Sequence, residues 1–148
     1  MPENAQLPPA DRASAICVHL LEAVARQASS VDSETVPTCK GVYVWRSLKS
    51  GEAVYVGSAV GQEGLWKRIV RQHLNDSYRM PDRGEKSVFR KAVAVDVGVR
   101  PGPQCVDLIK EQFSVAFLAC PGDTTEVIHQ AEAALIRQLK PKYNKAGR

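Results

Sequence analysis

Two apolar runs separated by a polar turn occupy the middle of the chain. Residues 41–45 and 53–56 are rich in β-branched and aromatic side chains, and the turn-prone segment 46–52 lies between them. This pattern predicts a β-hairpin whose strands each carry one tyrosine, Tyr43 and Tyr55. Function then depends on what the rest of the fold places around these two phenols.

Helical periodicity and strand-like alternation predict the other elements. Apolar and other side chains alternate over residues 113–119, which predicts a strand. For residues 92–99, the β-branched side chains make a strand the alternative to a helix. A polar loop is expected over residues 75–85, and Asp123 with Glu126 resembles a capping box at the start of the last helix. Apolar residues at helical spacing predict helices over residues 10–28, 65–74, 86–97, 106–111 and 127–139.

These elements predict a mixed α/β (α+β) fold: a small, three-stranded, mainly antiparallel sheet flanked by helices, with an extra N-terminal helix. A chain of 148 residues is long enough for one domain with a core of its own. A polar linker divides it into residues 1–39, with the first helix, and residues 40–148, the main domain. We expect the first helix to pack on the domain; the alternative is that it binds a protein partner or mediates self-association.

Charge is distributed unevenly along the chain. Residues 1–39 hold 2 basic and 5 acidic side chains, whereas residues 40–148 hold 18 basic and 11 acidic ones. A basic domain favours a polyanionic partner, because binding to phosphates releases condensed counterions. On charge alone, a basic surface that serves only solubility is equally compatible.

The cysteines and the apolar segments exclude several classes of protein. The four cysteines are scattered, without the spacing of a zinc site. The apolar stretch 13–25 is interrupted by His19 and Glu22, which argues against a signal peptide or a membrane span. We therefore expect a cytoplasmic protein with reduced cysteines.

Two charged residues on predicted helices are candidates for chemistry. At about 100° per residue, Glu132 lies about 40° from Ile128 and about 20° from Leu139, which places it on or beside the buried stripe of the last helix. A carboxylate there needs a partner, either an arginine or a metal, unless it reaches solvent from the edge of the stripe. Arg68 belongs either to a solvated basic face or, if it turns toward the hairpin, to a phosphate-binding site.

The order of these motifs resembles that of the GIY-YIG nuclease family. The resemblance covers about residues 40–145. Its motifs are Gly41-Val42-Tyr43 and Tyr55-Val56-Gly57, then Arg68 in Leu65-Trp66-Lys67-Arg68, Glu132 in Glu132-Ala133-Ala134-Leu135-Ile136, and Asn144 in Lys140-Pro141-Lys142-Tyr143-Asn144.

This resemblance implies a DNA endonuclease that hydrolyses phosphodiester bonds with one divalent metal, Mg²⁺ or Mn²⁺. It implies that Glu132 binds the metal, Arg68 stabilises charge on the phosphate, and Tyr43 activates or orients water with Tyr55. Asn144 would hold a tyrosine hydroxyl or the backbone. The basic run from 67 to 91 would contact DNA phosphates; the expected contacts are Lys67, Arg71, Arg90 and Lys91.

One position departs from the family pattern. Many relatives have a histidine four residues after the arginine, where this chain has Gln72 and then His73. Five α-helical residues correspond to about 140°, so we expect His73 near Trp66 and Ile69, partly buried and away from Arg68. The alternative function is a nucleic-acid-binding protein that keeps the fold without catalysis. Repair, restriction and mobile-element movement are all compatible pathways.

Overall fold

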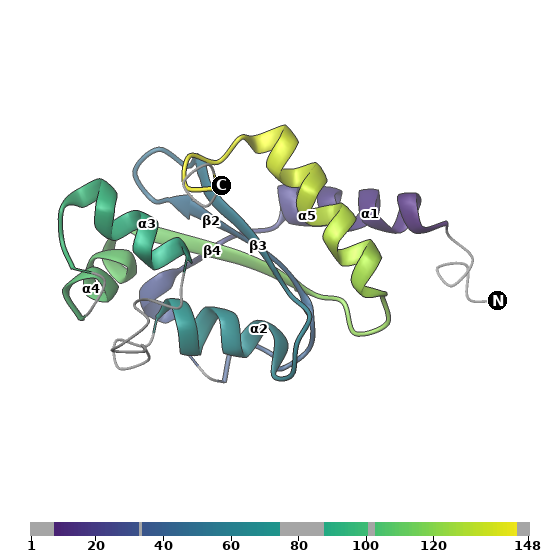
Figure 1. Ribbon diagram of the computed structural model, residues 1–148, viewed down its shortest axis with the longest axis horizontal. Coiled ribbons are helices and arrows are strands. Elements are labelled where there is room, and N and C mark those ends of the chain that lie inside the picture. The colour runs from purple at the N-terminus through teal and green to yellow at the C-terminus, as the bar shows by residue number, and fades with distance from the viewer. Residues whose placement is uncertain (1–7, 33, 75–87, 101–102, 145–148) are drawn as a thin grey trace.

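The computed structural model describes residues 8–32, 34–74, 88–100 and 103–144, and an antiparallel sheet lies at its centre (Figure 1). β2 (Gly41–Ser47) and β3 (Ala53–Ala59) form the predicted hairpin. β4 (Phe113–Ala119), the other predicted strand, pairs with the opposite edge of β2. The strand order is β1-β4-β2-β3, so β3 forms one edge of the sheet.

The sheet has a fourth strand, so the prediction of three strands is wrong. β1 (Arg26–Gln27) pairs with β4 and is followed by a 3-10 turn, η2 (Ala28–Ser30). Both residues of β1 are polar and exposed, so the sequence lacks the apolar alternation that would predict a strand there. The first helix, α1 (Pro9–Glu22), accordingly ends six residues before the predicted boundary at residue 28.

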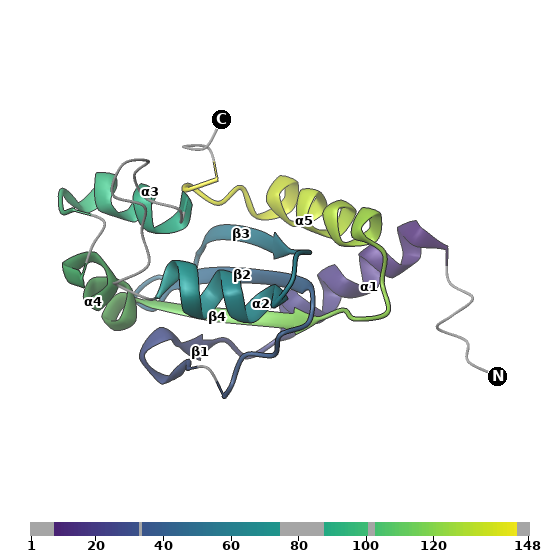
Figure 2. The ribbon, with the colours of Figure 1, turned by 60° about the horizontal axis from the view of Figure 1, so that its bottom comes forward.

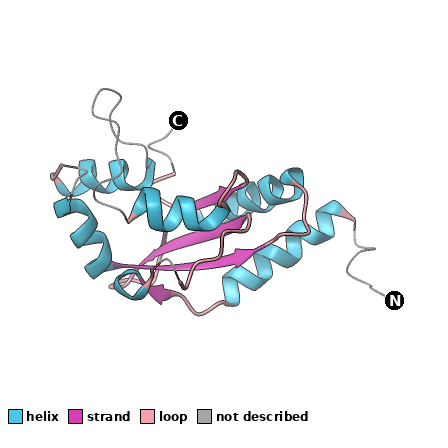
Figure 3. Ribbon diagram, turned by 90° about the horizontal axis from the view of Figure 1, so that it is seen from below, coloured by secondary structure: helices cyan, strands magenta, loops and turns pink. Residues whose placement is uncertain are grey.

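The two faces of the sheet are covered by different helices. Successive strand residues point to opposite faces. Val44 and Val56 pack with α1 and α5 (Thr125–Leu139), whereas Tyr43 and Trp45 pack with α2 (Gly64–Trp66), η3 (Lys67–His73) and α3 (Val88–Val97). In Figures 1 and 2, α1 and α5 gather toward one end of the sheet and α3 and α4 (Pro103–Gln112) toward the other. Figure 3 shows the strands between these helices.

The remaining predictions are confirmed for the helices and wrong for one strand alternative. Residues 92–99 do not form a strand, because α3 continues to Val97 and ends at Gly98, whose φ is 77°. The short helix predicted over 106–111 is part of the longer α4. The predicted loop over residues 75–85 lies outside the described residues. No helix in the described part of the chain is long and apolar enough to cross a membrane.

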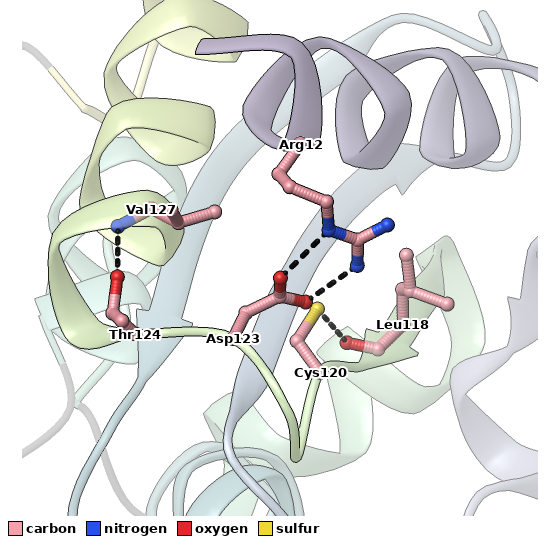
Figure 4. A network of polar contacts seen from close by, with 6 residues as sticks. All are labelled: Arg12, Leu118, Cys120, Asp123, Thr124 and Val127. Carbon is pink, nitrogen blue, oxygen red and sulfur yellow. Dashed lines mark hydrogen bonds and ion pairs between the residues drawn. The ribbon is translucent and has the colours of Figure 1, made fainter. Parts of the chain in front are cut away.

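α1 belongs to the same core as the rest of the fold. Its buried residues include Ile16 and Leu20, which share a cluster with the sheet and α5. The Arg12 guanidinium donates to both carboxylate oxygens of Asp123, at 2.9 and 2.8 Å (Figure 4). Asp123 is therefore not the helix cap: the Thr124 hydroxyl accepts from the Val127 N–H and begins α5 (Figure 4).

Removing the Arg12 side chain should loosen the attachment of α1. Because the contact is bidentate and partly buried, Arg12→Ala should lower the free energy of unfolding by about 1–2 kcal/mol. Urea unfolding measures this change, and Arg137→Ala, which removes an exposed arginine of α5, is the control. A loss no larger than that of the control would show that apolar packing alone holds α1.

Candidate active site

The hairpin places its two tyrosines on the same face of the sheet. Across the strands, Tyr43 is paired with Gly57 and Tyr55 with Trp45. The two phenol ring centroids lie 6.4 Å apart; Tyr43 is 1% exposed and Tyr55 is half-buried. A Cβ on residue 57 would overlap the ring and hydroxyl of Tyr43. Glycine at this position therefore lets the Tyr43 side chain lie across β3.

A π-helical turn, η3, lies within the helix predicted over 65–74 and carries Arg68 and His73. The Leu74 N–H donates to the Ile69 C=O at 3.1 Å, five residues back. In this wider helix, five residues return the chain to the same side, whereas five α-helical residues would not. The positive charge of Arg68 contributes to lowering the pKa of His73. His73 is buried, as expected, and its ring contacts those of Tyr43, Trp45 and Tyr55.

Tyr43 and His73 contact each other in the core. The Tyr43 Oη and the His73 Nε2 lie 2.9 Å apart, at hydrogen-bond distance. Burial, followed by the charges of Arg68 and Arg90, lowers the pKa of His73 to about 3. At neutral pH the imidazole is therefore neutral and has one acceptor nitrogen. When that nitrogen is Nε2, the Tyr43 hydroxyl donates its hydrogen bond to it.

The pKa values of both tyrosines are raised. Burial is the main cause for Tyr43, with a smaller contribution from Tyr55; Arg68 lowers this pKa and Glu132 raises it further. For Tyr55, burial and then Glu132 raise the pKa, and Arg68 opposes them. Both phenols therefore stay protonated in the protein alone. The charges of Arg68 and Glu132 thus act on both phenols.

The buried neutral histidine should make folding sensitive to acid. Above pH 6.5, His73 is deprotonated in both the folded and the unfolded chain; below it, only the unfolded chain gains the proton until the pH nears the folded pKa of about 3. Stability should therefore fall as the pH drops through this window, by about 2 kcal/mol at pH 5. Urea unfolding at pH 7.5 and 5 measures it.

Two histidine variants isolate this effect. His73→Gln should lose the acid-dependent drop, whereas His129→Gln, at an exposed position of α5, should keep it. An equal drop in wild type and His73→Gln would contradict the low pKa of His73.

Glu132 approaches from the other face of the sheet. It is half-buried on α5, beside the apolar stripe as predicted, and its Oε1 accepts a hydrogen bond from the Ser58 Oγ at 2.8 Å. The partner is thus a hydroxyl of β3 and not the arginine considered from the sequence. Glu132 therefore lies on the α5 face of the edge strand β3, whereas the tyrosines lie on the opposite face of the sheet, where the charge of Glu132 still raises their pKa values.

Asn144 holds the same edge strand by its backbone. Its Oδ1 accepts from the Val56 N–H at 2.8 Å, and its Nδ2 donates to the Val56 C=O at 2.9 Å. The N–H of the preceding residue, Tyr143, donates to the Val54 C=O. An amide that satisfies both backbone groups of one residue replaces a neighbouring strand. Of the two roles expected for Asn144, the structure contains the backbone role.

The predicted DNA contacts differ in accessibility. Lys91 is exposed, Lys67 is half-buried, and the side chain of Arg71 lies outside the described residues. Arg90 is 0% exposed, so the prediction that it contacts DNA is wrong, because a phosphate contact requires a guanidinium at the surface. Lys67 and Arg68 also line a small cavity of about 110 Å³, together with Gly61 and Gly64 of the segment that follows β3.

The side chains at this site suit a cation that keeps water molecules as most of its ligands. Within the described residues, no three His, Cys, Asp or Glu side chains gather as a metal-binding group, as a structural zinc site would require. Mg²⁺ is commonly held by one or two carboxylates together with waters and substrate phosphates, and Mn²⁺ also prefers oxygen ligands. A carboxylate has about four lone-pair sites, so Ser58 leaves most of those of Glu132 open. Glu132 therefore fits Mg²⁺ or Mn²⁺.

Two residues of this site escaped prediction as site residues. Ser58 shares a strand face with Val56, so alternation places it toward α5, but the same pattern describes an ordinary surface serine. His73 enters the site through its contact with Tyr43, a tertiary contact that residue spacing within one helix does not reveal.

No protein-family model matches this chain, and no curated protein matches it.

Proposed function

We propose that this chain is a Mg²⁺-dependent DNA endonuclease of the GIY-YIG type. The observation that carries the proposal is the buried contact between Tyr43 and His73, with Arg68 and Glu132 near enough to shift the pKa of the phenol. A tyrosine that is to take a proton from water needs an acceptor for its own proton, and the His73 Nε2 is the acceptor within hydrogen-bond distance of it. The order of Tyr43, Arg68 and Glu132 along the chain agrees with the family motif, from which His73 departs by one position.

In this mechanism Tyr43 handles the proton of the attacking water. With its own proton directed at the His73 Nε2, Tyr43 has oxygen lone pairs for the water. Because Tyr43 is 1% exposed in the protein alone, this step requires the site to admit the water when DNA and metal bind. The water proton passes to Tyr43 as the phenol proton passes to His73, while the water oxygen bonds to phosphorus and the ester bond from phosphorus to the departing oxygen breaks. Because His73 is a weak base here, this transfer must accompany the attack, during which the water becomes more acidic.

The charged residues of the site would stabilise the phosphate. Arg68 is exposed, and its guanidinium can bind two oxygens of one phosphate as negative charge develops. Glu132 would hold Mg²⁺, which supplies positive charge to the phosphate and to the departing oxygen. Tyr55, half-buried beside Tyr43, would orient the water or the phosphate.

The surface around the site suits contacts to the DNA backbone. Lys67 and Lys91 are accessible cations, and contacts of this kind position a duplex without reading its sequence. We therefore expect little sequence preference from the described residues.

One observation favours a second candidate function, binding of nucleic acid without catalysis. Both tyrosines have raised pKa values and the pKa of His73 is about 3, so the protein alone is poor in bases at neutral pH. A site that never acquires a metal would bind phosphates through Arg68 without cleaving the phosphodiester bond.

Incubation of purified protein with supercoiled plasmid separates the two functions. We expect nicked or linear DNA with Mg²⁺ or Mn²⁺, none with a chelator, and almost none with folded Tyr43→Phe. DNA binding without cleavage under either metal would favour the binding protein. Undiminished cleavage by folded Tyr43→Phe would refute the catalytic role of Tyr43.

A further inference from the structure

We propose that Ser58 is a positioning residue for Glu132: its hydroxyl holds the carboxylate in the orientation that binds the divalent cation. The proposal rests on the function proposed above. Its basis is the 2.8 Å hydrogen bond from the Ser58 Oγ to the Glu132 Oε1, which links the edge strand β3 to the helix α5. In this contact β3 and α5 reach each other through polar side chains at the rim of an apolar interface.

The backbone geometry fixes where Ser58 points. Val56 and Ser58 are two residues apart and therefore share a strand face, and Val56 packs in the cluster that contains Ala131 of α5. Ser58 continues this face toward the end of β3, where Glu132 flanks the same helical stripe. Asn144 holds both backbone groups of Val56, so the strand that carries Ser58 is itself held in place.

The chemistry of the contact favours a positioning role. A glutamate side chain is long and loses rotamer freedom when it must present one orientation to a metal. A hydrogen bond to a carboxylate is charge-assisted and directional, so it can select that orientation before the metal arrives. The hydroxyl occupies one of about four lone-pair sites and leaves the others for the cation.

Hydrogen bonds of this kind are usually visible in metal affinity. Loss of a group that orients a metal ligand typically weakens metal binding by about 10–100-fold. A serine that only fills space at the edge of the sheet would leave the metal affinity unchanged. The two roles therefore differ in a quantity that can be measured apart from catalysis.

Three serine variants provide the comparison. Ser58→Ala removes the hydroxyl, and Ser58→Thr keeps it in a residue that strands accommodate well. Ser50→Ala removes an exposed hydroxyl in the turn of the hairpin and is the matched control. Mn²⁺ affinity is measured by electron paramagnetic resonance on each protein bound to duplex DNA, in the Tyr43→Phe background so that the DNA is not cut.

We expect Ser58→Ala to weaken Mn²⁺ binding by about 10-fold or more, and Ser58→Thr and Ser50→Ala to bind Mn²⁺ like their parent. With Tyr43 restored, Ser58→Ala should raise the Mg²⁺ concentration for half-maximal plasmid cleavage by a similar factor, at unchanged affinity for DNA. In a Glu132→Gln background, Ser58→Ala should have no further effect on Mn²⁺ binding, because the group it positions is gone.

Unchanged Mn²⁺ affinity in folded Ser58→Ala would overturn the positioning role, as would an equal loss in Ser58→Ala and Ser58→Thr. These results leave the proposed function standing if wild-type protein still cuts plasmid and Glu132→Gln does not. Absence of cleavage by wild-type protein would instead overturn the proposed function, so the two failures are distinguishable.

Discussion

Replacement of Glu132 by glutamine should reduce plasmid cleavage by about a thousandfold or more. A bound metal contributes several kcal/mol to stabilising the charge of a phosphoryl transition state, and each 1.36 kcal/mol corresponds to a factor of ten in rate. Glutamine keeps the shape of the side chain and retains an oxygen that can accept from the Ser58 hydroxyl. The free energy of unfolding should therefore change by less than about 1 kcal/mol.

Glu126→Gln is the matched control for this prediction. Glu126 lies on the same helix, α5, but is exposed in its first turn, away from the hydroxyl of Ser58. This variant should cut DNA at a rate close to wild type. Cleavage that persists in folded Glu132→Gln, or that falls equally in both variants, would remove Glu132 from the metal site.

Alanine at position 57 should also reduce cleavage strongly, although glycine has no functional group. The added methyl group would overlap the ring and hydroxyl of Tyr43, so the ring must move or the strands must separate. Overpacking of this kind costs about 1–3 kcal/mol of stability. Displacement of a reacting group by about 1 Å can reduce a rate by about 100-fold, and we expect a loss of plasmid cleavage of that size.

Gly61→Ala tests whether the effect is local. In the described part of the chain, no heavy atom other than those of its chain neighbours lies within 4 Å of a Cβ built at Gly61, so this variant should keep its stability within about 0.5 kcal/mol and its activity. Gly57→Ala should add little to the loss caused by Tyr43→Phe, because both act on the same phenol. A folded Gly57→Ala protein with wild-type activity would show that the position of the Tyr43 hydroxyl is unimportant.

The elements with a clear apolar period could be predicted from the sequence. β4 has the predicted bounds, and α5 begins two residues before its predicted start at residue 127. The end of α1 was misjudged because apolar spacing continues to Val24, which is 93% exposed in the structure. β1 could not be predicted, because its two exposed residues join the sheet through backbone pairing with a distant strand.

The residue types of the site were predictable, whereas their orientation was not. Glu132 and Arg68 were proposed from helical spacing and from motif order. The contact between His73 and Tyr43 depends on how η3 packs against the sheet, which spacing within the helix does not reveal. The burial of Arg90 depends on tertiary packing around α3, which a basic run in the sequence does not reveal.

A crystal structure of Tyr43→Phe protein bound to duplex DNA and Mn²⁺ would test the proposed site most directly, because anomalous scattering locates the metal without relying on activity. Our mechanism predicts one Mn²⁺ in direct contact with a carboxylate oxygen of Glu132 and with a DNA phosphate, and the Arg68 guanidinium on that same phosphate. A Mn²⁺ bound elsewhere, or DNA lying away from the β3 edge, would contradict it.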